Sequence, residues 1–332
     1  MSDRVKRLFF GFLFIALLTS STGASAKVLQ QTSKGSGDTA IIIASFGTTV
    51  PTAVTAIMNI YNKTKEAYPE TEVKIVFTSN IIRSVWQERQ GEAQKWIDMG
   101  IPREILFIKN IISTIGDLRE EGYRNIIVQP THMFYMEQSQ DLKSYVDAIA
   151  SIRTTKDKWR PFDILTMGRP ALGMPGDRYD YHEDLAKAVK TLAEDAELAQ
   201  KEDALLIYMG HGNNHWSTGI YAEMQKKMRE AYPAVKTYVG VVEGMPGLED
   251  LLPAIKHADT KKVILKPFMI VAGDHAKNDM AGEEADSWKS ILTKEGYEVY
   301  PVLQGLGSNN AFARIFVDHV NDVAKENNIT LK

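Results

Sequence analysis

The chain contains an internal repeat that covers most of its length. The segment Asp203–Gly212 (DALLIYMGHG) echoes Asp38–Gly47 (DTAIIIASFG) at an offset of 165 residues. Two further matches follow in the same order, 67–69 with 231–233 and 126–130 with 263–267. A chain made of two copies of one unit is expected to form two similar domains that face each other across a cleft.

Each copy alternates short apolar runs with amphipathic stretches of helical period. In the first copy the predicted strands are 40–46, 73–78, 105–108 and 125–129, and the predicted helices are 51–68, 83–99, 111–121 and 138–152. Fully apolar strands separated by helices are typical of a parallel sheet that is covered on both faces. The predicted fold class is therefore α/β, with two parallel sheets related by the duplication.

The N-terminus has the pattern of an export signal. Basic residues precede the unbroken apolar run Leu8–Leu18, and the small residues Ala24–Ala26 follow it. A basic head, a short apolar core and an A-x-A end predict a secretory signal peptide over 1–26, cleaved after Ala26. A membrane anchor needs about 20 apolar residues, so stable membrane insertion is not expected. The mature protein is predicted to be periplasmic.

The rest of the chain divides at a connection rich in proline and glycine. Residues 30–37 (QQTSKGSG) are polar and small, and the segment 27–37 is predicted to be a flexible arm. The stretch 154–180 is expected to contain a strand and the link between the domains. The predicted domains are therefore an N-terminal domain at 38–165 and a C-terminal domain at 166–332.

Composition excludes several classes of function. The chain has 332 residues, of which 44% are hydrophobic and 24% charged, and it has no cysteine. Such a composition excludes a fibrous or disordered protein. The lack of cysteine excludes thiolate metal sites, iron–sulfur clusters and cysteine nucleophiles. The formal charge of −3 argues against a nucleic-acid partner.

The two copies differ where predicted strands end at the cleft. From the first copy to the second, His211 replaces Phe46, Glu243 replaces Ser79 and His275 replaces Gln138. Ligands of open α/β sheets bind outside the carboxyl ends of the strands. Two imidazoles and one carboxylate there form an open ligand set suited to a divalent ion such as Co²⁺, Fe²⁺, Ni²⁺ or Zn²⁺. The C-terminal domain is therefore predicted to carry a metal site.

Each member of this trio also has a structural interpretation. His211 could cap a tight turn, Glu243 could cap the following helix, and His275 could begin a helix. His215 is expected to be solvated. Three further histidines are assigned to structural or surface roles: His182, His257 and His319. The run 133–136 (MFYM) predicts core packing, with a hydrophobic slot for a ligand or a subunit contact as alternatives.

Several segments together resemble a known family, the anaerobic cobalt chelatases of the CbiK type. They are 77–83 (FTSNIIR), 210–212 (GHG), 242–244 (VEG), 266–282 (KPFMIVAGDHAKNDMAG) and 286–289 (DSWK). The resemblance runs from about Asp38 to His319. It implies the chelatase fold, which is shared with ferrochelatase: two flavodoxin-like or Rossmann-like domains with a tetrapyrrole cleft between them.

The same resemblance implies insertion of Co²⁺ into the tetrapyrrole sirohydrochlorin, with Fe²⁺ as a second candidate ion. His211 is expected to be the principal base and metal ligand, with Glu243 and His275 completing the site. The predicted substrate-binding residues are Glu137, Phe46, Ser79 and Arg83. Arg83, Lys266 and Lys277 are candidates for contacts to substrate carboxylates.

The export signal opens an alternative function. A chelatase for corrinoid biosynthesis is expected in the cytoplasm, where its substrate is made, whereas this chain is predicted to be exported. The alternative is a periplasmic protein that binds or transports haem or a metal in the same cleft without turnover. His132, just past a first-copy strand, is a candidate for such a haem, and a homo-oligomer is a further candidate assembly.

Overall fold

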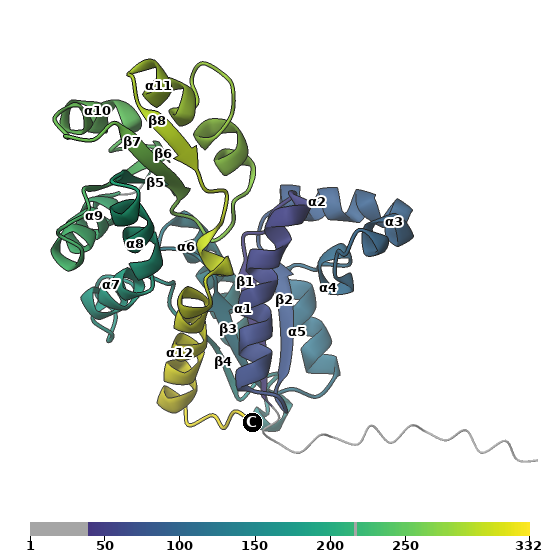
Figure 1. The fold of residues 1–332 in the computed structure, drawn as a ribbon. Coiled ribbons are helices and arrows are strands. Elements are labelled where there is room, and N and C mark those ends of the chain that lie inside the picture. Colours follow the sequence, from purple (N-terminus) through teal and green to yellow (C-terminus); the bar gives the residue numbers. More distant parts are fainter. Residues whose placement is uncertain (1–38, 216–217) are drawn as a thin grey trace, which may run out of the picture. The chain divides into compact units, whose positions relative to one another are not determined.

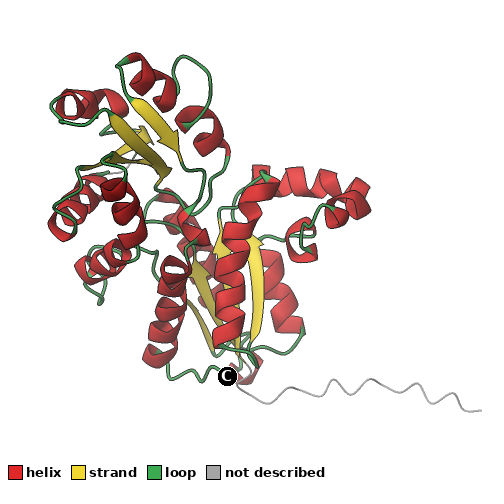
Figure 2. Cartoon of the chain, in the orientation of Figure 1, coloured by secondary structure: helices red, strands yellow, loops and turns green. Residues whose placement is uncertain are grey.

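The computed structural model describes residues 39–215 and 218–332, all within one compact unit. The predicted signal peptide at 1–26 and arm at 27–37 lie outside the described residues. Two four-stranded sheets dominate the fold, each with helices on both faces (Figures 1 and 2). Within the described ranges, none of the helices has both the length and the apolarity needed to cross a bilayer.

The two sheets have the same strand order, and all neighbouring strands are parallel. The first sheet, in the order β2-β1-β3-β4, comprises β1 (Thr39–Ser45), β2 (Glu72–Phe77), β3 (Asn125–Pro130) and β4 (Ile164–Met167). The second, in the order β6-β5-β7-β8, comprises β5 (Leu205–Gly212), β6 (Thr237–Glu243), β7 (Lys262–Pro267) and β8 (Glu298–Pro301). The predicted α/β class with two duplicated parallel sheets is confirmed.

The register of the strands repeats as well as their order. Ser45 lies opposite Phe77 in the first sheet, and the equivalent residues Gly210 and Val241 lie opposite each other in the second. A slip of one residue would turn every side chain to the other face of a sheet. Equal registers therefore show that the sequence repeat is also a repeat of the packing.

Helices connect the strands in both copies. Those before residue 151 are α1 (Val54–Ala67), α2 (Asn80–Arg89), α3 (Ala93–Asp98), α4 (Arg103–Leu106), α5 (Ile111–Glu120) and α6 (Glu137–Ala150). The later ones are α7 (Tyr181–Lys190), α8 (Ala193–Lys201), α9 (Gly219–Ala231), α10 (Leu248–Lys256), α11 (Trp288–Lys294) and α12 (Asn310–Glu326). Short 3₁₀ turns occur at Pro51–Ala53, Gln90–Glu92, Asp157–Trp159 and Leu306–Ser308, and a π-helical turn at Ala276–Met280.

Alternate residues of each central strand pack on opposite faces. In β1, Ile41 and Ile43 belong to the core with α1 and α12, while Ile42 belongs to the core with α5 and α6. In β5, Tyr208 packs on the side of α7 and α9, and Ile207 on the side of α10 and α11. Parallel strands buried on both faces read as continuous apolar runs, which is why the sequence located them correctly.

Two elements of the first sheet's layers include residues beyond 165, where the N-terminal domain is predicted to end. Strand β4 pairs with β3 as far as Met167, two residues beyond the predicted end at 165. Helix α12 follows the whole second copy in sequence, yet it packs against α1 and β3 of the first (Figure 1). The last helix thus completes the cover of the first sheet.

Two predicted elements of the first copy are wrong in detail. The expected strand at 105–108 is the one-turn helix α4, which begins after Pro102 and buries Ile105 and Leu106. Only Lys109 beyond it makes an isolated bridge, to Val76. A short apolar run cannot distinguish a strand from a buried helical turn. The expected helix at 83–99 is broken at 90–92 into α2 and α3.

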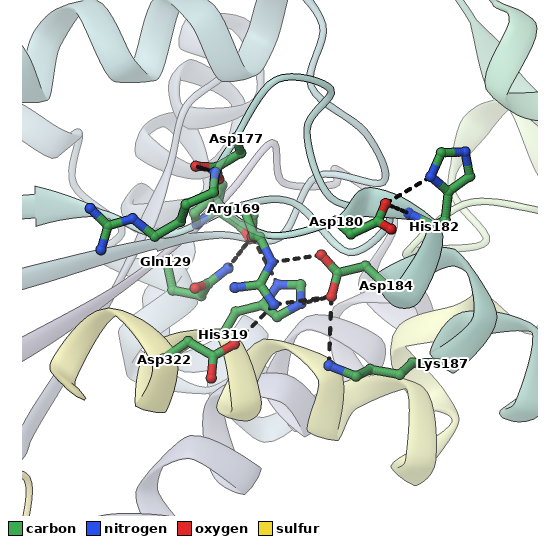
Figure 3. Close-up of polar contacts among 11 residues, drawn as sticks. Gln129, Arg169, Asp177, Asp180, His182, Asp184, Lys187, His319 and Asp322 are labelled. Atoms are coloured by element: carbon green, nitrogen blue, oxygen red, sulfur yellow. Dashed lines mark hydrogen bonds and ion pairs between the residues drawn. The ribbon is translucent and has the colours of Figure 1, made fainter. Parts of the chain in front are cut away.

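A buried ionic cluster joins three segments that are distant in sequence (Figure 3). Arg169, just after β4, binds Asp184 of α7 through Nε at 2.6 Å and Nη2 at 3.0 Å, and Nη2 also reaches Asp322 of α12 at 2.9 Å. His319 of α12 bonds the Arg169 carbonyl through Nδ1 and Asp184 through Nε2. The cluster therefore ties α7 and α12 to the chain leaving the first sheet.

The charge on Asp184 is strongly favoured in the folded protein. Burial alone would raise the pKa of its carboxyl group, but hydrogen bonds from His319 and Arg169 outweigh that effect and hold the pKa well below its usual range. A carboxyl group whose pKa is depressed by folding stabilises the protein above its unfolded pKa. That stability is lost as the pH falls below the unfolded value.

We expect Asp184→Asn to lower the free energy of unfolding at pH 7 by about 3–5 kcal/mol, because Arg169 and His319 would lose a buried partner. The difference from the wild type should shrink as the pH falls below about 4, the usual range of an aspartate. Urea unfolding at several pH values measures both effects. Asp259→Asn, at a side chain that is 97% exposed, is the control. Equal effects of the two substitutions would contradict a stabilising role for the cluster.

Candidate active site at the carboxyl ends of the two sheets

A pocket of about 200 Å³ lies among the carboxyl ends of strands from both sheets. Its lining comes from the ends of β1, β3 and β5 and from the segments that follow β3 and β7. The residues include Ser45, Phe46, Thr131, His132, Met133, Phe134, Glu137, Gln138, His211, Asn213, Tyr221, Phe268 and Ile270. Both copies thus contribute to one predominantly apolar pocket, the place where open α/β folds bind ligands.

Tight packing at the end of β5 fixes His211. A Cβ on Gly210 would lie 2.4 Å from the ring of Tyr221, so position 210, next to His211, has room only for the hydrogen atom of a glycine. The buried Tyr221 hydroxyl accepts a hydrogen bond from the Gly212 backbone N–H at 3.2 Å. Glycines on both sides of His211 therefore let the strand end pack closely while the imidazole reaches the pocket.

Glu243 lies beside this strand end because the parallel ladder runs further in the second copy. Its partner in the register is Gly212, which has φ of +79° and would place a Cβ 1.9 Å from the Glu243 carbonyl oxygen. The first ladder ends two positions earlier, at Ser45 and Phe77. The extension brings the backbone of Glu243 next to that of the residue after His211.

His275 approaches His211 from the segment after β7. The two imidazole rings meet edge to face, with 4.9 Å between ring centroids and 90° between planes. His275 precedes the π-helical turn Ala276–Met280 and is half-buried. Two of the predicted metal-binding side chains are therefore in contact in the structure.

Among the described residues, the hydrogen bonds of both rings use the same nitrogen, Nδ1. His211 Nδ1 lies 3.0 Å from the carbonyl oxygen of Gly212, and His275 Nδ1 lies 2.7 Å from Asp279 Oδ2. A carbonyl or a carboxylate can only accept, so each Nδ1 must carry the proton. Each neutral imidazole then presents an unprotonated Nε2, the form that binds a metal or accepts a proton.

The trio does not form a closed ligand set. Among the described residues, no three histidine, cysteine, aspartate or glutamate side chains are grouped closely enough to hold a metal ion. His211 and His275 are adjacent, and Glu243 is placed by the backbone pairing with Gly212 rather than by a contact of its carboxylate. The three ligand roles therefore stay predictions.

The first copy contributes the opposite lining of the pocket. Phe46, which is 43% exposed, and Glu137, the first residue of α6, both line it, and their substrate-binding roles stay predictions. Met133 and Phe134 line it too while packing against the core, so both interpretations of the 133–136 run apply. Tyr221 also lines the pocket and was missed, because nothing in the sequence marks an aromatic of a helix face as cleft-facing.

His132 is also a pocket residue, but a buried one. Its Nδ1 lies 2.8 Å from Ser139 Oγ, and its Nε2 has no hydrogen-bond partner among the described residues. Burial lowers the pKa of this imidazole to about 4, so the ring is neutral at physiological pH. Its candidate role in haem binding stays a prediction.

Two of the predicted substrate-binding residues, Ser79 and Arg83, do not line the pocket. Ser79 caps α2 by accepting a hydrogen bond from the Ile82 N–H. Arg83 donates to the carbonyl oxygens of Phe77 and Thr78 and borders a separate hollow between the starts of α5 and α6. These contacts give Ser79 and Arg83 structural roles, and their substrate roles stay predictions.

Lys266 is not available to a substrate carboxylate. Its ammonium group is buried and forms an ion pair with Asp195, which also accepts a hydrogen bond from the Tyr208 hydroxyl at 2.6 Å. A buried lysine needs such a partner because the interior does not solvate its charge. The expected substrate contact of Lys266 is therefore wrong, whereas Lys277 is exposed and keeps its candidacy.

A larger hollow elsewhere does not have the features of an active site. It has a volume of about 580 Å³ and lies along β2, α4 and α5. Its charged groups neutralise one another, as in the pairs Lys74–Glu72 at 2.9 Å and Lys109–Asp117 at 2.7 Å. No histidine lines it. The smaller pocket, with its histidines and apolar walls, is the better candidate.

Comparison with known proteins identifies a family. A family model described as cobalt chelatase (CbiK) matches residues 39–325. The chain belongs to the CbiK cobalt chelatase family. The sirohydrochlorin cobaltochelatase CbiKC of Nitratidesulfovibrio vulgaris is 27% identical over 292 residues, 88% of this chain and 91% of the relative. The sirohydrochlorin cobaltochelatase of Salmonella typhimurium is 27% identical over 283 residues, 85% of this chain and 94% of the relative.

A solved structure supports the fold. SirB from Bacillus subtilis with Fe³⁺ superimposes with a TM-score of 0.58 and 14% identity, covering 89% of this chain and all of SirB. At that identity the likeness concerns the fold alone. The resemblance to CbiK-type chelatases and the chelatase fold, both predicted from the sequence, are confirmed.

The close packing at Gly212 gives a testable consequence for this family member. We expect Gly212→Ala to destabilise the protein by more than the roughly 1–3 kcal/mol of a strained backbone, because the methyl group would collide with the Glu243 carbonyl. Gly176→Ala is a matched control, since Gly176 has φ of +80° but no atom within 4 Å of a new Cβ. Urea unfolding measures both. Equal losses would contradict the close approach of β5 and β6.

Proposed function

We propose that this protein inserts Co²⁺ into sirohydrochlorin in the pocket at the carboxyl ends of the two sheets. Both named relatives are sirohydrochlorin cobaltochelatases and align over more than four-fifths of this chain. The observation that carries the proposal is the contact of His275 with His211, which lines an apolar pocket; among the described residues the hydrogen bonds of both rings use Nδ1. An apolar pocket with a few convergent polar groups suits a large flat ligand.

In this proposal the apolar walls hold the macrocycle. Phe46 and Phe134 of the first copy offer aromatic surface, and Met269 and Val271 line the pocket from the second copy. The pocket is smaller than the roughly 300–1,000 Å³ typical of sites for drug-sized ligands, so it encloses only part of a tetrapyrrole. The carboxylate arms would then extend toward solvent, where the exposed Lys277 is a candidate contact.

Metal insertion exchanges the pyrrolic N–H protons for the ion. Co²⁺ is first held by Nε2 of His211 and His275, with the Glu243 carboxylate completing the set. As the ring nitrogens take the ion, the His211 lone pair is released and accepts a pyrrolic proton. Glu243 and His275 pass protons on to solvent. Both protons leave the macrocycle and one divalent ion enters, so charge is conserved.

The preorganised bases explain why a protein is needed. Pyrrolic N–H groups are very weak acids in water, so a base must act while the ion is already close. A neutral imidazole near pH 7 both binds a borderline divalent ion and accepts a proton. Fe²⁺ satisfies the same donor set, and it is the second candidate ion of this proposal.

We expect His211→Ala to lower kcat/KM for Co²⁺ insertion by about 10²–10⁴-fold, because a general base is removed. Insertion is followed by the change in the absorption spectrum of sirohydrochlorin, with the uncatalysed rate subtracted. His215→Ala is the control, since His215 is exposed and lies four residues further along the chain. A His211→Ala variant with a nearly wild-type rate of insertion would contradict the assignment of His211 as the general base. A Soret band in the purified protein without turnover would support the haem carrier instead.

The proposal includes export of this activity. The sequence at 1–26 has the pattern of a secretory signal, so the mature chain would begin at Lys27 in the periplasm. N-terminal sequencing of protein from fractionated cells tests this directly. A cytoplasmic protein that retains residues 1–26 would contradict it.

A further inference from the structure

The turn that carries His275 is anchored by its buried face. Ala276 and Met280 are fully buried in the core beside Trp288 of α11. The residue before each of them, His275 and Asp279, is only half-buried and lies on the adjacent face of the turn. Side chains four residues apart on a helical turn are neighbours. The anchored face therefore sets the spacing of the His275–Asp279 pair.

The contact between these two side chains is short and directional. His275 Nδ1 lies 2.7 Å from Asp279 Oδ2, a distance typical of a charge-assisted hydrogen bond. The carboxylate can only accept, so it selects the tautomer with the proton on Nδ1. Neutral histidine in water favours the other tautomer, in which Nε2 carries the proton and cannot bind a metal ion. Asp279 thus shifts the ring toward its binding form.

We propose that Asp279 is the positioning residue for His275: its carboxylate fixes the ring orientation and the Nδ1–H tautomer, so that Nε2 is free for the ion. This inference rests on the proposed function, because it assumes that His275 binds Co²⁺. Neither Asp279 nor His275 is among the residues that line the pocket, and Asp279 would act through its hydrogen bond with His275. His211 has the simpler arrangement, in which a backbone carbonyl accepts its Nδ1–H.

His275 donates to a carboxylate and His211 to a backbone carbonyl, and this difference affects how strongly each Nε2 binds a metal ion. A carboxylate increases the electron density of the imidazole that donates to it more than a carbonyl does, and it makes Nε2 a stronger ligand. His275 would then be the tighter holder of the incoming ion. His211 would release the ion more readily and regain a lone pair for the pyrrolic proton.

The same turn supplies a matched control. Asp274 accepts a hydrogen bond from the Asn278 amide at 3.0 Å, so it makes the same four-residue bridge one position earlier. Asp274 is exposed and does not contact His275 in any hydrogen bond or ion pair among the described residues. A loss that arises only from weakening the turn should appear in both aspartate variants.

The first experiment is a titration of the metal-free full chain with Co²⁺ alone, followed by calorimetry and by the visible spectrum of the bound ion. We expect Asp279→Ala to raise the Kd by about 10–100-fold, the usual effect of removing the partner of a metal-binding histidine. Asp279→Asn should lose less, because the amide oxygen still accepts the Nδ1–H. Asp274→Ala should stay close to the wild type.

Further variants separate this inference from the proposed function. If His275→Ala raises the Kd and Asp279→Ala does not, the positioning role of Asp279 is overturned while the ligand role of His275 stands. If His275→Ala leaves the Kd unchanged, the ligand role fails and the inference fails with it. Equal losses in Asp274→Ala and Asp279→Ala would assign the effect to the turn as a whole.

A second readout would not respond to a merely structural role. The ¹⁵N chemical shifts of the His275 ring in the metal-free protein report which nitrogen carries the proton. We expect the Nδ1–H tautomer in the wild type and a shift toward the Nε2–H tautomer in Asp279→Ala. A wild-type ring with its proton on Nε2 would overturn the proposal.

Discussion

The parallel pairing of β5 with β6 is the constraint on which the candidate site depends. The pairing continues to Gly212 and Glu243, whereas the equivalent ladder of the first copy stops two positions earlier. Only a glycine tolerates the contact at Gly212, because its backbone has a positive φ and meets the Glu243 carbonyl. One small residue thus brings a histidine-bearing strand end and a glutamate-bearing one together.

The first copy has the same scaffold as the second but carries different side chains at its strand ends. Its equivalent strand ends carry Phe46, Ser79 and Gln138, of which Phe46 and Gln138 line the pocket and Ser79 caps a helix. Duplication therefore divides the three compared strand ends: those of the first copy carry no imidazole and those of the second carry His211 and His275, while both copies supply apolar lining. The division requires that the copies stay together, which a shared core, α12 and the Arg169 cluster provide.

Much of this could be predicted from the sequence. The repeat indicated two parallel sheets, and comparison of the copies singled out His211 and His275, whose rings are in contact. The repeat worked because equal registers place equal positions at equal strand ends. The substrate role expected of Lys266 failed because its partner Asp195 lies 71 residues away in sequence, and no local pattern reveals such a pair.

Other features could not be predicted from the sequence, because they depend on contacts between segments that are distant in the chain. The crossing of α12 to the first sheet depends on the path of the chain in space. The sequence predicts a structural or surface role for His319, but it does not reveal the cluster that His319 forms with Arg169 and Asp184. The hydrophobic periodicity of a helix or strand shows which of its faces is buried, but it does not show which segment of the chain packs against that face.

The central claim is that His211 and His275 bind the substrate ion through Nε2 before it enters the macrocycle. Anomalous diffraction at the cobalt edge, on crystals of the protein soaked with Co²⁺ in the absence of tetrapyrrole, tests it most directly. The account predicts a single strong peak within bonding distance of both Nε2 atoms, with the Nδ1 atoms still bonded to Gly212 and Asp279. A cobalt peak only at surface carboxylates, or one bound through Nδ1, would contradict it.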